Sequence, residues 1–215
     1  GQAEIANSAK TRFLASASHD LRQPIHTLSL FSAALGMQKL DDKTRQIAGH
    51  MDTALEGLAY QLDALLDISK LDAGVVQVDM QPVDMARLVH RLFNEHEPLC
   101  EEKGIALELD CVEQAPVLTD IALLERILRN LISNAVKYTD EGTVSIRIRP
   151  EARHFCITMA DTGRGIPQEE QSRIFEEFYQ LQNPERDRKK GLGLGLAIVK
   201  RLAKMLEIDV AIEST

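Results

Sequence analysis

A histidine on a predicted helix is the strongest candidate nucleophile in this 215-residue chain. His19 follows Ser18, which lies on a seam of residues spaced by threes and fours, so the imidazole is expected at the helix edge, within reach of solvent. The adjacent Asp20 can hold the Nδ1–H of the ring and leave Nε2 free to attack. Pro24 has no N–H for the carbonyl of Asp20, so we expect the helix to bend there. A histidine on a helix flank is also an ordinary solvated residue, so other sites must supply the rest of any chemistry.

Two asparagines and a lysine share a face of a second predicted helix. Asn130, Asn134, Lys137 and Tyr138 recur at three- and four-residue steps. The amide oxygens of Asn130 and Asn134 suit Mg²⁺, which prefers hard oxygen ligands and retains waters and phosphates. Lys137 can meet a phosphate as a point charge. Two surface asparagines on an exposed helix would give the same pattern, and that alternative stays open.

Two glycine motifs suit a nucleotide. In the stretch Asp161–Pro167, a carboxylate at a strand end can accept an adenine amino hydrogen, while Gly163 and Gly165 let the backbone approach the base. The run Gly191–Leu196 opens a helix, where backbone N–H groups form an anion site. It fits neither the Rossmann fingerprint nor a Walker loop. The preceding charged residues suit a mobile lid over a triphosphate or a merely solvated loop, and they are Glu185, Arg186, Asp187, Arg188, Lys189 and Lys190.

A helical hairpin is expected to carry the histidine. One helix runs from the N-terminus to about residue 39, and a second, capped by Asp41 or Asp42, ends near Gly74 in a left-handed cap. Each helix has one apolar stripe, and two such helices cannot close a core. We therefore expect pairing with a second copy into a four-helix bundle.

The alternation of strand-like and helical patterns after residue 74 predicts a mixed α/β sandwich with helices on one face of the sheet, so the expected fold class is α+β. The predicted strands are 75–80, 105–109, 143–149, 155–160 and 208–212, and the predicted helices are 85–103, 120–137 and 195–206.

Composition excludes several classes. The net charge of −8 argues against nonspecific nucleic-acid binding, which needs a basic surface. No apolar run approaches the ~18 residues of a membrane span, and no signal peptide is present. The chain opens with glycine rather than methionine, which indicates an excised segment. Three cysteines without metal-ligand spacing predict buried or free thiols in a reducing compartment.

The order of the motifs resembles a sensor histidine kinase of two-component signalling, over essentially the whole chain. The matching segments are the histidine box Ser18–Pro24, the hairpin exit Leu66–Gly74, the asparagine box Asn130–Tyr138, the first glycine box Asp161–Pro167, the aromatic segment Phe175–Tyr179 and the second glycine box Gly191–Leu196.

The resemblance implies a dimerisation and histidine-phosphotransfer domain over residues 1–74, followed by a catalytic ATP-binding domain of the Bergerat (GHKL) fold over residues 75–215. It makes His19 the phosphoacceptor, Asp20 its orienting base and Asn134 the main Mg²⁺ ligand, with Asn130 assisting. Phe175 and Phe178 resemble the lid anchor. The implied ATP-binding set is Asn130, Asn134, Lys137, Tyr138, Asp161, Gly163, Gly165, Ile166, Lys190, Gly191, Leu192, Gly193, Leu194, Gly195 and Leu196.

The implied activity is ATP-dependent autophosphorylation of His19, then transfer to an aspartate of a response-regulator receiver domain. The implied partners are a second copy in a homodimer and that receiver domain, either in the same protein, as in a hybrid kinase, or on another one. The segment would be a cytoplasmic module, and membrane attachment of the parent protein stays open. Two alternatives are a non-catalytic pseudokinase scaffold and an ATPase of the gyrase or mismatch-repair kind. The second lacks a preceding hairpin with an exposed histidine.

This chain departs from the family pattern at two places. The family more often has Glu-Leu-Arg-Thr-Pro after the histidine, whereas Asp20 and Gln23 stand here. Thr or Asn at the position of Gln23 commonly supports dephosphorylation of the partner, so we expect weak phosphatase activity at most. The chain also stops at Thr215, before the final strand usual in this fold.

Overall fold

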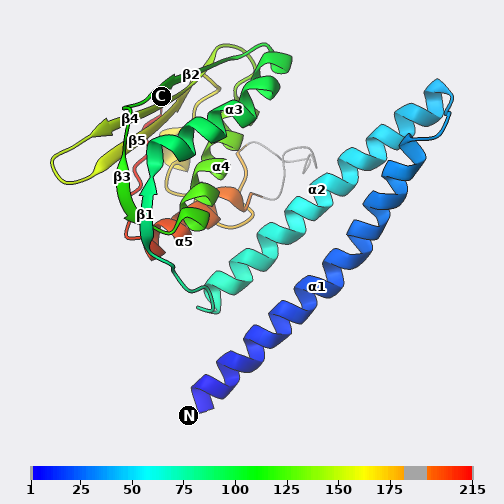
Figure 1. Cartoon of the computed structure of the whole chain (residues 1–215), viewed down its shortest axis with the longest axis horizontal. Helices are drawn as coiled ribbons and strands as arrows, with labels where there is room; N and C mark the ends of the chain where they lie inside the picture. The colour runs from blue at the N-terminus through cyan, green and yellow to red at the C-terminus, as the bar shows by residue number, and fades with distance from the viewer. Residues whose placement is uncertain (1, 182–192, 215) are drawn as a thin grey trace. The chain divides into compact units, whose positions relative to one another are not determined.

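A computed structural model describes residues 2–181 and 193–214, with side chains described at Ser16 and from His19 onward (Figure 1). The chain divides into two compact units. The first contains Gly1–Gln77 and Pro184–Leu194, and the second contains Val78–Asn183 and Gly195–Thr215. Each unit is described by itself.

The first unit is a hairpin of two long helices, α1 (Gln2–Gly36) and α2 (Asp42–Asp72), which lie side by side (Figure 1). Asp41 is the N-cap of α2 and accepts the N–H of Thr44 at 2.9 Å. Gly74 follows the helix with φ 65°, so the expected left-handed cap is confirmed. Helix α1 continues through Pro24.

The seam between the helices leaves much apolar surface uncovered within one chain. Ala48, Ala64 and Ser32 are buried, but most large apolar side chains of the hairpin are exposed. They are Leu21, Leu28, Leu30, Phe31, Met37, Ile47, Met51, Leu58, Tyr60 and Leu65. An ion pair from Arg22 Nε to Asp63 Oδ1, 2.7 Å long, joins the two helices. The unit therefore has an apolar face that one chain does not bury.

The second unit is a mixed α/β layer structure with two sheets. Its elements are β1 (Gln81–Asp84), α3 (Met85–Lys103), β2 (Ala106–Asp110), β3 (Pro116–Thr119), α4 (Ile121–Tyr138), β4 (Thr143–Pro150), β5 (Phe155–Asp161), the short 3₁₀ helix η1 (Gln168–Glu170) and α5 (Gly195–Met205). Strands β1 and β3 form an antiparallel pair, and β4 lies between β2, which is parallel to it, and β5, which is antiparallel.

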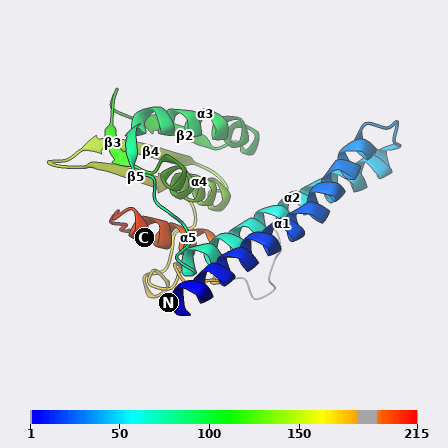
Figure 2. The same ribbon diagram turned by 60° about the horizontal axis from the view of Figure 1, so that its bottom comes forward.

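The core lies between the three-stranded sheet and the helices. Figures 1 and 2 show α3, α4 and α5 gathered on one side of the strands, with α4 between the other two helices. Alternate residues of β4 point into this core, and Val144, Ile146 and Ile148 are at most 1% exposed. The helices contribute fully buried side chains, among them Val89, Leu92, Leu128, Ile132, Ile198 and Leu202. The predicted α+β class with helices on one face is confirmed.

Two ion pairs join α3 to α4 at the surface. Arg91 contacts Glu125 at 2.7 Å, and Arg129 contacts Glu95 at 2.6 Å. The Arg91 guanidinium, assisted by Arg129, holds the pKa of Glu125 below its usual range against the opposing effect of burial.

Two predicted strands are wrong, and two strands, β1 and β3, were not foreseen. Residues 75–80 form no strand, and the N–H of Asp79 instead donates to the Asp120 carboxylate at 2.9 Å. Residues 208–212 pair with no strand that the structure describes, because the chain turns after α5 and the N–H of Ile208 bonds the Ala203 carbonyl. Strands β1 and β3, which pair with each other, were missed because each contains a proline, Pro82 and Pro116, a residue that argues against a strand in sequence.

The helices start where the sequence places acidic caps. Asp84 accepts the N–H groups of Ala86 and Ala115. Asp120, which is buried, accepts those of Asp79, Ala122 and Leu123 at 2.9–3.0 Å. Burial opposes ionisation of Asp120, but the three backbone donors outweigh it and lower its pKa.

Replacing the Asp120 cap is expected to weaken the second unit. Asp120→Ala leaves three backbone N–H groups without their acceptor and should lower the free energy of unfolding by about 1–3 kcal/mol at pH 7. The pKa of Asp120 is depressed in the folded state. Its ionisation therefore stabilises the fold above the usual aspartate pKa of about 3.9, and this contribution is lost as the pH falls through the lowered value.

Urea unfolding at a series of pH values measures this difference. The exposed Glu113→Ala is the control, which should stay close to the unsubstituted protein. A gap between Asp120→Ala and the unsubstituted protein that failed to narrow in acid would contradict the assignment.

Candidate functional site

Helix α4 is the platform on which the predicted nucleotide residues meet. Asn130 is buried, and its Nδ2 donates to the carbonyl of Arg126 one turn earlier at 2.9 Å. Asn134 lies one turn further along the helix and is half-buried. Lys137 and Tyr138 end the helix and are also half-buried. These four residues are spaced along α4 by steps of three and four residues, and the helix begins at the Asp120 cap.

The second glycine box approaches this face from the N-terminus of α5. A Cβ on Gly195, the first residue of α5, would lie 2.9 Å from Asn130 Oδ1 and 3.7 Å from Asn134 Nδ2. Gly193 has φ 72°, a backbone conformation that L side chains rarely adopt, and Leu194 is buried. Glycine is therefore required where the helix N-terminus faces the asparagines. Of the predicted set, Lys190, Gly191 and Leu192 lie outside the described residues.

The first glycine box approaches the other end of α4. The N–H of Gly163 donates to Asp161 Oδ1 at 2.9 Å, which closes the turn after β5. A Cβ on Gly163 would overlap the carbonyl oxygen of Tyr138. Gly165 has φ 68°, and the N–H of Ile166 donates to the Ser214 hydroxyl. The turn thus rests directly on the last residue of α4 and leaves the Asp161 carboxyl exposed beside it.

Two cations flank the Tyr138 ring. Lys137 Nζ lies 5.0 Å and the Arg164 guanidinium 4.9 Å from the ring centroid. Burial raises the pKa of the Tyr138 hydroxyl, and Arg164 opposes that rise. The sequence analysis assigned no role to Arg164, which lies between Gly163 and Gly165 in the first glycine box. A positive charge between these two glycines was the sequence feature that could have indicated its place at the site.

This arrangement suits an adenine nucleotide. The face presents neutral amides, a lysine, one exposed carboxylate and the N-terminus of α5, whose backbone N–H groups and dipole favour an anion. The turn that carries Asp161, through Gly163, and the N-terminus of α5, through Gly195, contact α4 near opposite ends of the segment 130–138. A ligand with a base at one end and phosphates at the other matches that polarity.

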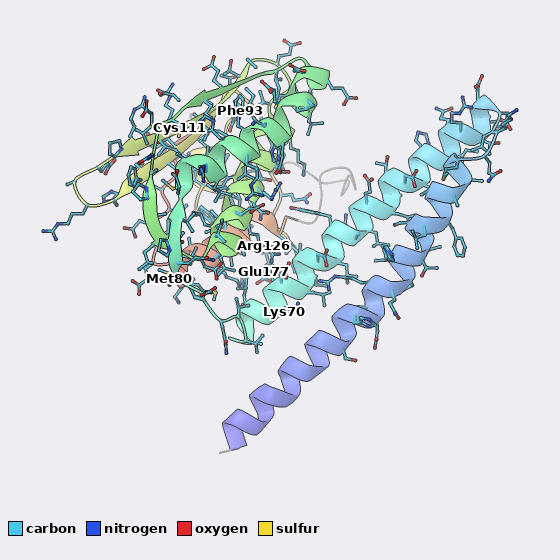
Figure 3. The ribbon with its side chains drawn as sticks, in the orientation of Figure 1. Lys70, Met80, Phe93, Cys111, Arg126 and Glu177 are labelled. Atoms are coloured by element: carbon cyan, nitrogen blue, oxygen red, sulfur yellow. The ribbon has the colours of Figure 1, made fainter. Side chains whose placement is uncertain are left out.

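The aromatic segment lies against α5. Lys200 Nζ is 5.6 Å from the Phe175 ring, and Glu177, labelled in Figure 3, forms an ion pair with Arg201. Phe178 has φ 61° and is 58% exposed. A groove of about 430 Å³ runs here, lined by Phe175, Glu176, Glu177, Lys200, Arg201 and Lys204. Phe175 is therefore packed while Phe178 projects to solvent.

In the hairpin, His19 lies beside its neighbouring carboxylate. His19 Nδ1 is 3.4 Å from Asp20 Oδ1, and both side chains are about two-thirds exposed. The Ser16 hydroxyl donates to the other Asp20 oxygen at 3.4 Å. Gln23, one turn further on, is exposed. The carboxylate faces Nδ1, so Nε2 is the ring nitrogen left available for attack.

Two family models match the chain. Residues 9–74 match the His Kinase A (phospho-acceptor) domain, and residues 119–215 match the histidine kinase-, DNA gyrase B- and HSP90-like ATPase family. Among the described residues, no helix has both the length and the apolar character needed to cross a membrane.

Curated relatives extend the match across both units. The aerobic respiration control sensor protein ArcB homolog of Haemophilus influenzae is 34% identical over 92% of this chain and 61% of that protein. The circadian input-output histidine kinase CikA of Synechococcus elongatus is 34% identical over 99% of this chain and 29% of that protein. The chain thus spans less than two thirds of the length of these relatives.

Solved structures agree. Full-length ShkA in complex with AMPPNP aligns over 90% of this chain and 40% of its own, with a TM-score of 0.75 and 29% identity. The Acinetobacter baumannii histidine kinase AdeS aligns over 86% of both chains with a TM-score of 0.59, and its 23% identity supports the fold alone. A phospho-acceptor domain followed by an ATPase domain, in a chain that aligns over 92% and 99% of its length with a sensor protein and a histidine kinase, means that this protein belongs to the sensor histidine kinase family.

Proposed function

We propose that the chain is the core of an ATP-dependent protein-histidine kinase that autophosphorylates His19 and passes the phosphoryl group to an aspartate of a receiver domain. Residues 1–74 are the dimerisation and phosphotransfer domain, and residues 75–215 are the ATP-binding domain. The observation that carries this proposal is the pairing of an exposed imidazole, oriented by Asp20, with a nucleotide-shaped face on α4. Support also comes from the ShkA likeness, because that structure is a complex with AMPPNP.

His19 is the nucleophile of the first step. Its Nε2 attacks the γ-phosphorus of ATP, a bond to the β-γ bridging oxygen breaks, and ADP leaves. Asp20 accepts the Nδ1–H, fixes the tautomer and balances the positive charge that develops on the ring. Neither side chain has to be uncovered before ATP can reach it, because both are exposed.

The nucleotide is held along α4. Asp161 accepts a hydrogen from the adenine amino group, and Lys137 and Tyr138 line the nucleotide between base and phosphates. The backbone at Gly193 and Gly195, at the N-terminus of α5, faces the phosphates. The remaining residues of the two glycine boxes set the backbone conformation around the nucleotide, and they are Gly165, Ile166, Leu194 and Leu196.

A divalent cation fits the asparagines. Asn134, half-buried beside the α5 N-terminus, and Asn130 present amide groups where phosphates would meet that terminus, and amide oxygen is a ligand that Mg²⁺ accepts. Asn134 is the main protein ligand and Asn130 assists. When bound, Mg²⁺ offsets the negative charge of the phosphates.

Two further roles follow from the hairpin. Its uncovered apolar side chains support a homodimer through a four-helix bundle, since burial contributes about 25 cal/mol per Å² of apolar surface. Gln23 would orient a water molecule for hydrolysis of a receiver's aspartyl phosphate only weakly. The rate at which phosphorylated receiver decays when it is mixed with kinase and ADP measures this phosphatase activity.

The use of ATP as substrate and the free thiols fit a cytoplasmic module.

Removal of the nucleophile tests the proposed reaction. His19→Gln should abolish labelling of the protein by γ-labelled ATP while ATP affinity stays within about twofold, since the substitution leaves the α4 face unchanged. His26→Gln, on an exposed position of the same helix, is the control and should be labelled normally.

The chemical stability of the label separates the candidate functions. Phosphohistidine is lost in acid, an ATPase releases phosphate without labelling the protein, and a pseudokinase does neither. Acid-labile label that persisted in His19→Gln would overturn the assignment.

Substitutions at the two ends of the nucleotide face should affect different quantities, the autophosphorylation rate at one end and the ATP affinity at the other. Asn134→Asp should lower autophosphorylation by roughly 10²-fold or more, because the cation site gains a misplaced charge. Asp161→Asn should instead weaken ATP binding by roughly tenfold or more, because a full acceptor becomes a partly mismatched amide.

Calorimetric titration with ATP and initial labelling rates measure the two effects. Asn94→Asp, an exposed asparagine of α3, is the control for the added charge. Normal ATP affinity in Asp161→Asn with loss of turnover alone would show that Asp161 does not recognise adenine.

The apolar face of the hairpin should be a dimer interface. Leu58→Glu places a charge on an exposed apolar side chain of α2 and should yield monomers or aggregates in sedimentation equilibrium. Leu118→Glu makes the same change at an exposed leucine of β3 and should leave the dimer intact. A monomeric unsubstituted chain at micromolar concentration would rule out the dimer.

A further inference from the structure

The C-terminus of α4 is held by a side chain from another helix. Lys103 Nζ donates to three backbone carbonyls, those of Val136 at 2.7 Å, Lys137 at 3.2 Å and Thr139 at 2.6 Å. An ammonium group has three N–H donors, so the donors and acceptors match in number. The last carbonyls of a helix have no partner within the helix and carry its negative partial charge. Lys103 therefore satisfies the end of the helix that bears the asparagine box.

The backbone of Lys103 is fixed where this contact requires it. Lys103 is the last residue of α3, and Gly104 follows with φ 75°, its N–H bonded to the carbonyl of Glu101. The chain then enters β2, where the N–H of Ala106 donates to the carbonyl of Gly142. Both flanks of Lys103 are thus anchored, and its side chain is about one-third exposed. The nearest carboxylate, Asp140, is 3.8 Å away and fully solvated, so it competes weakly.

The residues that Lys103 holds are those that shape one end of the nucleotide face. Tyr138 lies between two of the bonded carbonyls, and its own carbonyl is the surface on which Gly163 rests. The Gly163 N–H in turn closes the turn that presents Asp161. A shift in the end of α4 therefore moves Lys137 and Tyr138 directly and the Asp161 turn through them. Thr139 is completely buried, so with the lysine in place its carbonyl relies on Lys103 Nζ rather than on water.

We infer that Lys103 is a positioning residue for nucleotide binding: it sets the end of α4, and with it Lys137, Tyr138 and the Asp161 turn, in the geometry that accepts the nucleotide. The inference rests on the proposed function, because it concerns the same ATP site. Lys103 touches no nucleotide itself. Its contribution is the same in the ground state and the transition state, so it acts on KM rather than on kcat.

Three variants of the intact chain test the inference. Lys103→Met keeps the aliphatic stem and removes the donors, and it should weaken ATP binding roughly tenfold, equivalent to about 1.4 kcal/mol, with kcat at saturating ATP within about twofold. Lys103→Arg restores donors on a longer side chain and should recover affinity to within about threefold. Arg87→Met removes a cation from an exposed position of the same helix and should change neither quantity.

The readouts distinguish positioning from general stability. Calorimetric titration with ATP and Mg²⁺ is carried out well below the thermal midpoint of every variant, where all are folded. A role in stability alone would lower the midpoint of Lys103→Met and leave its dissociation constant unchanged, and that result overturns the inference. If Lys103→Met does not fold, Lys103→Gln keeps a neutral donor. A rise of roughly threefold or more in its dissociation constant supports the inference, and an unchanged constant overturns it.

Failure of the proposed function has a separate signature. If the unsubstituted chain binds no ATP, the proposed function and this inference fall together. If it binds ATP and Asp161→Asn weakens that binding while Lys103→Met does not, only the inference about Lys103 falls.

Discussion

Helix α4 is approached closely at two points, by the turn after β5 and by the first residue of α5, and both contacts are made by glycines. A Cβ on Gly163 would overlap the Tyr138 carbonyl, and one on Gly195 would lie 2.9 Å from Asn130 Oδ1. These contacts bring backbone N–H groups and amide side chains to one surface and keep bulky groups away from it. A flat base and a chain of phosphates can lie against such a surface, because backbone donors reach them without a side chain in between. The rest of the second unit serves to hold α4 where both segments can meet it.

The supports of α4 differ in strength. Its N-terminus is held by Asp120, which is buried and bonded to three backbone N–H groups, and one side is held by a continuous layer of Leu, Ile and Val. The ion pairs from Arg91 and Arg129 are partly exposed, and such pairs contribute little each. The C-terminus depends on Lys103 alone among the side-chain contacts described here. Burial and backbone satisfaction therefore carry the helix, and one lysine sets its functional end.

The chemistry of the hairpin follows a different principle. His19 and Asp20 lie on a solvated helix surface, and both side chains are about two-thirds exposed. In the proposed reaction, the adjacent carboxylate is the group that prepares the His19 nucleophile, and the electrophile is the ATP bound by the second unit. An exposed imidazole is also accessible to a second protein, and this suits the proposed transfer of a phosphoryl group to a receiver domain. The same openness leaves the apolar face of the hairpin for a partner copy.

Much of the fold could be predicted from local signals. Helix α3 spans the predicted residues 85–103, and Asp41 and Asp120 cap the helices that follow them. These predictions succeed because a cap, an apolar period and a glycine stop act within a few residues of one another. Strands fared worse. Residues 208–212 alternate like a strand but pair with no described strand. Strands β1 and β3 contain prolines that argue against a strand, yet they pair with each other. A strand forms only when its backbone hydrogen-bonds to a partner strand, and that partner is distant in sequence.

The sequence by itself determined the functional class: a histidine box, an asparagine box and two glycine boxes in one order restrict the chemistry, because each residue type is needed for its own step. It also determined where the helices begin and end. Only the tertiary structure decided what holds these boxes together. The contact of Gly163 with Tyr138, the flanking of that ring by Arg164, and the bonds from Lys103 to the end of α4 join residues between 25 and 36 positions apart. No local pattern encodes such contacts, because the packing of α3, α4 and the sheet decides which side chain reaches which carbonyl.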